Sequence, residues 1–174
     1  MSKKCLVAYA SEAGSTREVA EKVGQVLADK GLSVDVRPVN QVRNLAGYDA
    51  VVLGTAIRMF RPLGKMMTFV NRHKNELAKV PTAAFTVGLA MKDAATKGTA
   101  DAEKYATPFL ARLTNRKSTT FFAGKLDLNT LTPLFRMMMS KMTESDPSSI
   151  GDFRDWNAIQ TWAETLPGSL GLAD

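Results

Sequence analysis

Near the start of the sequence lies Cys5-Leu-Val-Ala-Tyr-Ala-Ser-Glu-Ala-Gly-Ser-Thr-Arg-Glu-Val-Ala20, the stretch that decides the fold. Residues 5–10 are apolar without alternation, which is typical of a parallel strand covered on both faces. Small residues, hydroxyls and a glycine fill 11–16, and a helical stripe then follows and ends at Gly31: Val19, Val23, Val26 and Leu27. A strand that turns through hydroxyls into a helix predicts an anion site, because free amide N–H groups and the positive end of the helix dipole face the loop.

The composition of the loop 11–16 narrows the kinds of anion that could bind there. Ser15 and Glu18 have the Ser-x-x-Glu spacing of a capping box, so we expect the helix to begin there. The loop has no lysine and a single glycine, Gly14, which excludes the motifs G-x-x-x-x-G-K-[ST] and G-x-G-x-x-G. Hydroxyls without a lysine suit one phosphate monoester better than a pyrophosphate. An ordinary strand-to-helix turn with a good cap is the alternative.

Length and composition predict one domain over residues 1–174. The chain is 45% hydrophobic and 23% charged, as in ordinary globular proteins, and no apolar run is long enough to span a bilayer. No signal peptide is expected, and the single cysteine, Cys5, reads as a buried strand residue in a reducing cytoplasm. His73 is the only histidine and reads as a surface helix residue, so no transition-metal site is expected.

The net charge of +6 and the pI of about 9.5 bear on the partners of the protein. A basic chain suits a polyanion, an anionic membrane surface or an acidic protein. Basic residues do not alternate with aromatic ones along any face, so we expect no nucleic-acid partner.

Apolar runs and helical stripes alternate along the chain. The predicted strands are 5–10, 32–38, 48–54, 82–88 and 119–123, and the predicted helices are 15–30, 63–77, 99–113, 132–142 and about 153–166. This pattern predicts an α/β fold, a doubly wound three-layer sandwich with a five-stranded parallel sheet. Ligands of such sheets bind at the carboxyl ends of the strands, so the loops 11–16, 55–61 and 88–97 should converge on one site.

An insertion at 124–151 separates the last strand from the last helix. Thr132 and Pro133 predict a helix start there, and one stripe of that helix is apolar and rich in methionine: Leu134, Phe135, Met138, Met139 and Met142. One interpretation is a helix packed on the body of the protein, with methionines that fill gaps. The other is an adaptable surface for a partner, an apolar substrate or a membrane, which Met137, off the stripe, favours.

Two other α/β functions are excluded by missing residues. A receiver domain needs an aspartate after its third strand, where this chain has Val51-Val-Leu-Gly-Thr55, and Lys125 then reads as a surface lysine. A serine hydrolase needs a base near its nucleophile, and His73 lies far from any Gly-x-Ser-x-Gly motif.

Three segments together resemble the flavodoxin family over essentially the whole chain. They are Tyr9-Ala-Ser-x-x-Gly-Ser-Thr-Arg-Glu18, Tyr48-Asp-Ala-Val-Val-Leu-Gly-Thr-Ala-Ile-Arg58, and the tail from Ala123-Gly-Lys-Leu to Asp155-Trp156. Within the family the chain is similar to the menaquinone-dependent protoporphyrinogen dehydrogenase branch, which carries a comparable Ile-Arg loop and a Met-rich basic insertion. The resemblance implies the strand order 2-1-3-4-5.

The resemblance also implies FMN as the cofactor, with no catalytic acid or base and no metal. It places Ser11, Glu12, Ala13, Gly14, Ser15 and Thr16 at the phosphate. It places Thr55, Ala56, Ile57, Arg58 and Met59 on one side of the isoalloxazine, and Val87, Gly88, Leu89, Ala90 and Met91 near the ring edge. We expect the segment from Gly54 to Met59 to make the contact with the flavin N5.

Two departures from the family matter. Many flavodoxins flank the flavin with Trp or Tyr, where this chain has Met59 and Phe60, so we expect either weaker stacking on the flavin or a site open to a substrate. Many are acidic, whereas this chain clusters basic residues after the second loop: Arg58, Arg61, Lys65, Arg72 and Lys74. The cluster is either a solvated helix face or a docking surface for propionates, anionic lipid or an acidic protein.

Two functions follow from the resemblance. The first is an FMN-dependent oxidoreductase of heme biosynthesis that oxidises a porphyrinogen and reduces a quinone, in the cytoplasm or in peripheral contact with the inner face of an anionic membrane. The alternative is a soluble electron carrier between redox partner proteins, which the fold supports equally well. An FMN-binding sensor without turnover is a weaker third class.

Overall fold

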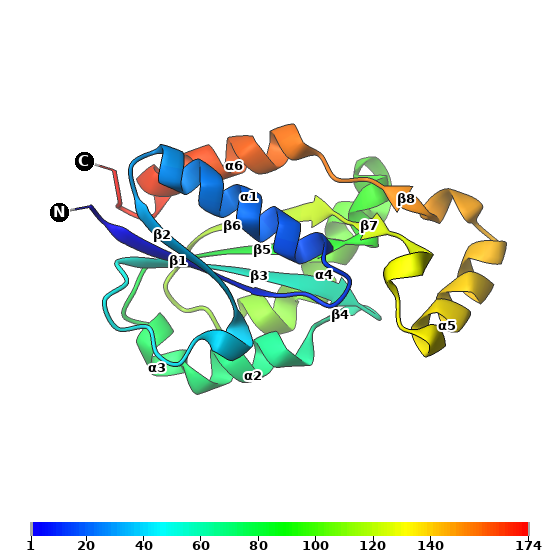
Figure 1. Cartoon of the computed structure of the whole chain (residues 1–174), viewed down its shortest axis with the longest axis horizontal. Coiled ribbons are helices and arrows are strands. Elements are labelled where there is room, and N and C mark those ends of the chain that lie inside the picture. The colour runs from blue at the N-terminus through cyan, green and yellow to red at the C-terminus, as the bar shows by residue number, and fades with distance from the viewer. Residues whose placement is uncertain (1, 174) are drawn as a thin grey trace.

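The computed structural model describes residues 2–173. Its central sheet consists of β1 (Lys4–Ala10), β2 (Ser33–Pro38), β3 (Ala50–Arg58), β5 (Thr82–Gly88) and β6 (Arg116–Ala123). These strands are parallel and lie in the order β2-β1-β3-β5-β6 (Figure 1). The short β4 (Arg61–Pro62) pairs antiparallel with the end of β3, so the order of the parallel strands is the predicted 2-1-3-4-5.

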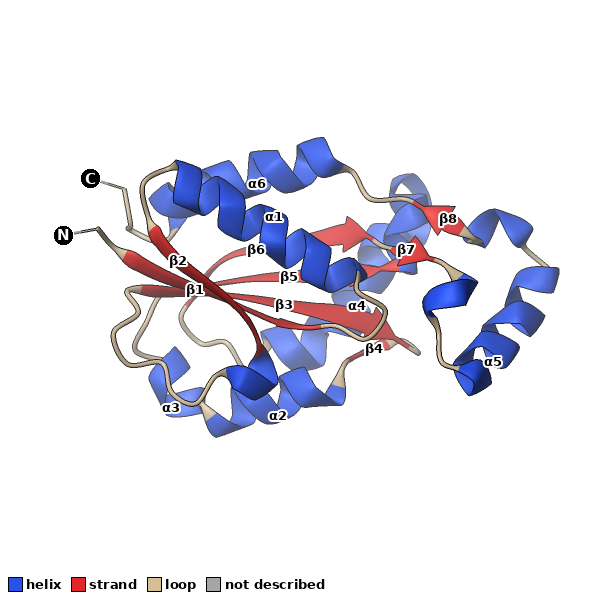
Figure 2. Ribbon diagram, viewed as in Figure 1, coloured by secondary structure: helices blue, strands red, loops and turns tan. Residues whose placement is uncertain are grey.

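Helices cover both faces of the sheet, as Figure 2 shows. One face carries α1 (Ser15–Asp29) and α6 (Trp156–Ser169). The other carries α2 (Gly64–Arg72), α3 (Lys74–Leu77) and α4 (Thr99–Leu110). The predicted α/β sandwich is therefore confirmed.

The core consists of two apolar layers because successive residues of a strand point to opposite faces. On β1, Cys5 and Val7 pack into the layer under α1 and α6, whereas Leu6 and Ala8 pack into the layer under α2 and α4. This two-sided burial explains the apolar run without alternation. Cys5 is fully buried, as predicted, and burial raises the pKa of its thiol to about 12, so the thiol stays protonated.

Several element boundaries differ from the prediction. The segment 55–58 continues β3 instead of opening a loop, and it forms a hairpin with β4. The predicted helix 63–77 is divided at His73 into α2 and α3. The predicted loop 88–97 is mostly wound into two irregular helical turns, Leu89–Asp93 and Ala94–Gly98.

His73 was expected on the surface, and this expectation is wrong. Its side chain is 2% exposed and packs on the Phe69 ring, with the centroids 4.6 Å apart. The Nδ1 atom lies 2.7 Å from Glu76 Oε1, and this contact and the Leu45 N–H hold the pKa of the Glu76 carboxyl below its usual range. His73 lies four residues after Phe69 and three after Val70, both of which are buried, so helical spacing already places the imidazole on the inner face of the helix.

The insertion forms a small subdomain at one end of the sheet (Figure 1). Its two ends pair as the antiparallel strands β7 (Lys125–Leu126) and β8 (Gly151–Asp152). Between them lies α5 (Pro133–Glu144), whose start agrees with the prediction from Thr132 and Pro133. None of the helices within residues 2–173 combines the length and the apolar character needed to cross a membrane.

Candidate cofactor site

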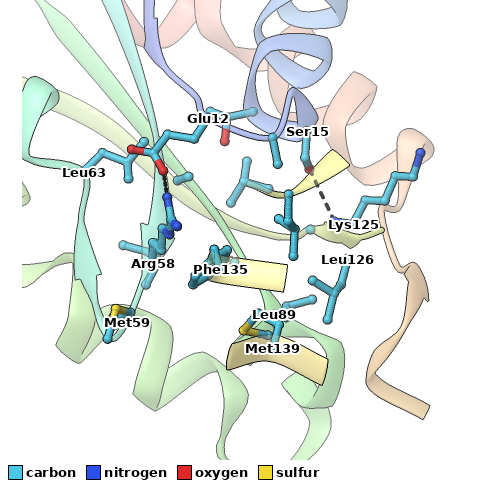
Figure 3. Close-up of a pocket in the computed structure, with 18 of the residues that line it drawn as sticks. Glu12, Ser15, Arg58, Met59, Leu63, Leu89, Lys125, Leu126, Phe135 and Met139 are labelled. Atoms are coloured by element: carbon cyan, nitrogen blue, oxygen red, sulfur yellow. Dashed lines mark hydrogen bonds and ion pairs between the residues drawn. The ribbon is translucent and has the colours of Figure 1, made fainter. Parts of the chain in front are cut away.

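A cavity of about 470 Å³ lies at the carboxyl ends of the central strands, within the size range of small-molecule sites. The loops after β1, β3 and β5 all line it, and α5 closes one side (Figure 3). The cavity brings together most of the residues that the resemblance assigns to the cofactor: Ser11, Glu12, Ala13, Ser15, Thr16, Ala56, Ile57, Arg58, Met59, Val87, Gly88, Leu89 and Ala90. It does not include Gly14, Thr55 or Met91.

Gly14, and not Ser15, caps the first helix. Its φ of 93° lies in the left-handed region that glycine adopts without strain, and the Glu18 N–H donates to its carbonyl oxygen at 3.0 Å. The predicted capping box is therefore wrong. The Ser15 hydroxyl instead accepts a hydrogen bond from the Lys125 N–H at 3.3 Å, and the Glu18 carboxylate pairs with Arg154 at 2.6 Å.

The beginning of α1 retains free hydrogen-bond donors. The first intrahelical bond comes from Glu18, so the amides of Ser15, Thr16 and Arg17 have no acceptor within the helix. The Thr16 side chain is buried and lines the cavity, and its hydroxyl bonds no other residue in the described range 2–173. Free amides, a free hydroxyl and the positive end of the helix dipole fit a phosphate monoester.

The second loop is a tight hairpin. Arg58 pairs with Arg61, so Met59 and Phe60 alone form the turn, with φ values of 49° and 65°. Two positive φ values match a type I′ turn, which glycine and asparagine ordinarily occupy. Both side chains are exposed and line the mouth of the cavity.

Arg58 joins this hairpin to the loop 11–16 and to the insertion. Its guanidinium pairs with the Glu12 carboxylate and lies over the Phe135 ring, 3.6 Å from the centroid (Figure 3). Nearby, the Lys65 Nζ donates to the Ser11 carbonyl oxygen at 2.7 Å. Two members of the predicted basic cluster are thus engaged with the loop 11–16 and do not simply face solvent.

The third loop is held to the insertion by Lys92. Its ammonium donates to Asp146 and Ser149 at 3.3 Å and to Ser148 at 3.4 Å. Hydrogen bonds from Ser148, Ser149 and Lys92 hold the pKa of the Asp146 carboxyl well below its usual range. The loop that borders the cavity and the return segment of the insertion therefore form one connected wall.

The insertion helix contributes an apolar wall. Phe135, Met138, Met139 and Met142 line the cavity, whereas Leu134 is 75% exposed and does not line it. The predicted stripe is therefore correct except for Leu134. Thr143 is the only buried residue of α5, and its hydroxyl donates to carbonyl oxygens of the same helix, so the helix lines the cavity more than it fills the core.

Several cavity residues were not predicted as site residues. They come from the residue before α2, from α4 and from the base of the insertion: Leu63, Asp101, Tyr105, Gly124, Lys125, Leu126, Thr130, Leu131 and Thr132. Asp101 and Tyr105 are spaced by one helical turn on a helix that follows the third loop, and this spacing was the available signal. Lys125 contacts the site through its backbone N–H, which donates to the Ser15 hydroxyl, and no sequence pattern predicts such a backbone contact.

Gly54 illustrates how tightly the site is backed by the core. A Cβ atom on Gly54 would lie 2.0 Å from the Phe85 ring, which is fully buried against Phe122 and Trp162. Any side chain at Gly54 would therefore clash with the core, and this clash would mask an effect on a bound flavin. The expected contact with the flavin N5 is better tested at Ala56 or Ile57, which line the cavity.

The whole arrangement agrees with one sequence family. The sequence model of the flavodoxin domain matches residues 6–149. This chain belongs to the flavodoxin family. FMN is the cofactor of flavodoxins, and the donors at the start of α1 suit its single phosphate.

Curated relatives of this flavodoxin include two protoporphyrinogen IX dehydrogenases (quinone). The protein from Leishmania major is 28% identical over 182 aligned positions, which cover 99% of this chain and 78% of that protein. The protein from Escherichia coli K12 is 30% identical over 109 positions, which cover 62% of this chain and 60% of that protein.

Solved structures share the fold at low identity. The flavodoxin of Streptococcus pneumonia TIGR4 has a TM-score of 0.56 and 17% identity, over 95% of this chain and 98% of that chain. A flavo di-iron protein of Thermotoga maritima has a TM-score of 0.59 and 15% identity, over 98% of this chain and 36% of that chain.

Proposed function

We propose that this flavodoxin is an FMN-dependent oxidoreductase that oxidises protoporphyrinogen IX and reduces a quinone. The observation that carries the proposal is the apolar wall of α5, which lines the same cavity as the loop 11–16, here called the phosphate loop. An electron carrier needs only an accessible flavin edge, whereas an apolar chamber beside the flavin suits an apolar substrate. The protoporphyrinogen IX dehydrogenases among the relatives support the same substrate.

The cofactor residues are part of this proposal. Ser11, Ser15 and Thr16 would hold the FMN phosphate together with the free amides of α1. Ala56 to Met59 would border one side of the isoalloxazine, and Val87 to Ala90 its edge. FMN, when bound, supplies the redox chemistry. The protein binds and orients the reactants, and the methionine and phenylalanine side chains of α5 exclude water from them.

The proposal is tested by anaerobic turnover of the FMN-loaded protein with protoporphyrinogen IX and a menaquinone analogue. We expect turnover that requires both FMN and the quinone. Met139→Gln places an amide in the apolar wall and should lower kcat/KM by about tenfold, since an unpaired buried amide costs about 1–3 kcal/mol. Met137→Gln is the matched control in an assay without membranes, because Met137 lies on the same helix but outside the cavity lining.

Two results would contradict the enzyme assignment. A normal flavin spectrum without turnover would favour the electron carrier. The cations Arg61, Arg72 and Lys74, which form no ion pair within residues 2–173, would then suit an acidic redox protein. Equal losses in Met137→Gln and Met139→Gln would show that the wall of α5 has no special role.

We further propose that the protein is cytoplasmic and that α5 contacts the inner face of an anionic membrane. Leu134, Met137 and Lys141 lie three or four residues apart, so they share one face of the helix. Leu134 and Met137 are highly exposed, and a lysine beside exposed apolar side chains suits an anionic lipid surface. Leu134→Gln should reduce sedimentation with vesicles that contain phosphatidylglycerol. Unchanged sedimentation, or none for the native protein, would contradict this contact.

A further inference from the structure

A second wall of the cavity is built from an aromatic pair and a carboxylate. Phe60 comes from the tip of the β3–β4 hairpin, and Asp101 and Tyr105 come from consecutive turns of α4. The Phe60 and Tyr105 rings lie 5.2 Å apart between centroids and are tilted by 56°. These three side chains line the cavity together with the wall of α5. The cofactor assignment uses neither Asp101 nor Tyr105, and Phe60 stands beside Met59 where many flavodoxins flank the flavin.

The hairpin holds Phe60 at this place against its backbone preference. Met59 and Phe60 both have positive φ, although neither is a glycine or an asparagine. Bulky residues in this conformation are strained and tend to occur at functional sites. The turn nevertheless displays the Phe60 ring at 69% exposure, in contact with Tyr105. A turn that served only to reverse the chain would not need an aromatic side chain.

Asp101 adds an unpaired acceptor to this aromatic pair. Its carboxylate is half-buried, and within residues 2–173 it forms no ion pair and no side-chain hydrogen bond. The Tyr105 hydroxyl likewise bonds no other described residue. An ionised carboxylate can only accept hydrogen bonds, so the free side of Asp101 favours a ligand that brings N–H or O–H donors.

We propose that Phe60, Tyr105 and Asp101 form the subsite for the reduced tetrapyrrole, with a pyrrole ring against the aromatic pair and its N–H groups directed at the carboxylate. This inference rests on the proposed function. A quinone presents carbonyl oxygens, which are acceptors, so Asp101 disfavours the quinone at this place. The subsite therefore belongs to the electron donor.

The same chemistry separates substrate from product. The sp³ bridging carbons of a porphyrinogen let its pyrrole rings tilt, so the N–H groups can point toward an external acceptor. The oxidised porphyrin is planar and keeps its N–H groups inside the ring, out of reach of a carboxylate. Asp101 therefore strengthens binding of the reduced donor and contributes little to binding of the product, which favours product release.

The test measures donor binding without turnover. The FMN-loaded protein is first reduced with dithionite, so that it cannot accept electrons, and protoporphyrinogen IX binding is then measured by anaerobic equilibrium dialysis. Asp101→Asn keeps the shape of the side chain and removes its charge. We expect its Kd for protoporphyrinogen to rise by about tenfold, the effect of losing a hydrogen bond to a charged group. Phe60→Leu should also weaken binding.

Three controls isolate the role of Asp101. Glu103→Gln removes an exposed carboxylate from the same helix, outside the cavity, and should leave the Kd unchanged. FMN affinity, measured by flavin fluorescence, should be equal in the native protein, Asp101→Asn and Glu103→Gln. The Kd for protoporphyrin IX and the KM for the quinone should also be unchanged in Asp101→Asn.

Native binding that is equally strong in Asp101→Asn and Phe60→Leu would overturn the subsite, as would an absence of native binding. Binding that depends on Asp101 but is followed by no turnover would support the subsite and reject the proposed oxidoreductase function. The failure of the subsite and the failure of the proposed function thus give different results.

Discussion

At the scale of single residues, the Thr16 hydroxyl is the clearest probe of the proposed cofactor site, since Thr16 lines the cavity and its hydroxyl bonds no other residue within 2–173. Thr16→Val keeps the shape of the side chain and removes the donor. We expect the Kd for FMN to rise at least about fivefold, because a hydrogen bond contributes about 1 kcal/mol, and more when it is made to a charged phosphate. Fluorescence titration of the FMN-free protein measures this.

The matched control for Thr16 is Thr107→Val. Thr107 lies on α4 outside the cavity, and its hydroxyl donates to the Glu103 carbonyl oxygen at 2.9 Å. Its loss should leave FMN binding as it is. Equal affinities in the native protein and Thr16→Val would remove Thr16 from the phosphate site.

Tyr48 and Asp35 give a second prediction at this scale, for stability. The Tyr48 hydroxyl donates to Asp35 Oδ2 at 2.6 Å and is the largest of the causes that lower the pKa of that carboxyl. Burial and the Asp35 contact raise the pKa of Tyr48 to about 12, so the donor persists at neutral pH. Tyr48→Phe should lower the free energy of unfolding by about 1 kcal/mol at pH 7.

The effect of Tyr48 should depend on pH with a definite sign. A carboxyl with a lowered pKa in the folded state stabilises the protein above its ordinary pKa of 3.8, and this stabilisation is lost as the pH falls through the lower folded value. Urea unfolding at pH 7 and at about pH 3 should therefore show a smaller difference between native protein and Tyr48→Phe in acid. A difference that grows in acid would contradict the pairing.

At the scale of elements, the β3–β4 hairpin combines poor turn residues with an exposed ring. The double substitution Met59→Asn and Phe60→Gly supplies the residues that a type I′ turn prefers. We expect the free energy of unfolding to rise by about 1 kcal/mol, because the strain of two left-handed residues is relieved. Thermal unfolding and protoporphyrinogen binding together measure the effect.

We therefore expect Met59 and Phe60 to lower the stability of the native hairpin and to strengthen its contact with the ligand. The double variant should bind protoporphyrinogen more weakly than the native protein while it unfolds at a higher temperature. A lower unfolding temperature would show that Met59 and Phe60 stabilise the hairpin by packing more than their positive φ values destabilise it.

At the scale of the whole molecule, Arg154 connects the insertion to the sandwich. Its guanidinium is 5% exposed and lies 2.6 Å from both Glu18 on α1 and Asp152 on β8. It holds the pKa of the Asp152 carboxyl below its usual range, and the two carboxylates keep Arg154 protonated. Because Glu18 follows the phosphate loop by less than a turn of α1, this contact fixes the return of the insertion beside the cofactor site.

Arg154→Gln should loosen the insertion. We expect faster proteolytic cleavage within 124–151 and a loss of at least about 1 kcal/mol in the free energy of unfolding, since two charge-assisted bonds disappear. Arg17→Gln is the control, because it removes an exposed ion pair with Glu21 on the same helix, where such pairs contribute little. Equal cleavage rates in both variants would show that β7 and β8 alone hold the insertion.

The sequence by itself determined the α/β sandwich, its strand order through the family resemblance, and the donors at the start of α1. These features depend on residues close together in the chain. An apolar run predicts a buried strand such as β1, and a stripe at helical spacing predicts a helix such as α5. The residues of the phosphate loop likewise lie on one continuous stretch, 11–16.

Only the tertiary structure decided which side chains meet across the cavity. Glu18 forms an ion pair with Arg154, a residue far along the chain, instead of the predicted capping contact. Gly14 is the N-cap residue of α1 because its backbone adopts a positive φ. Asp101 and Phe60 face one cavity because α4 packs beside the β3–β4 hairpin. Such contacts join residues without a shared periodicity, so their physical cause is the packing of separate elements around one sheet.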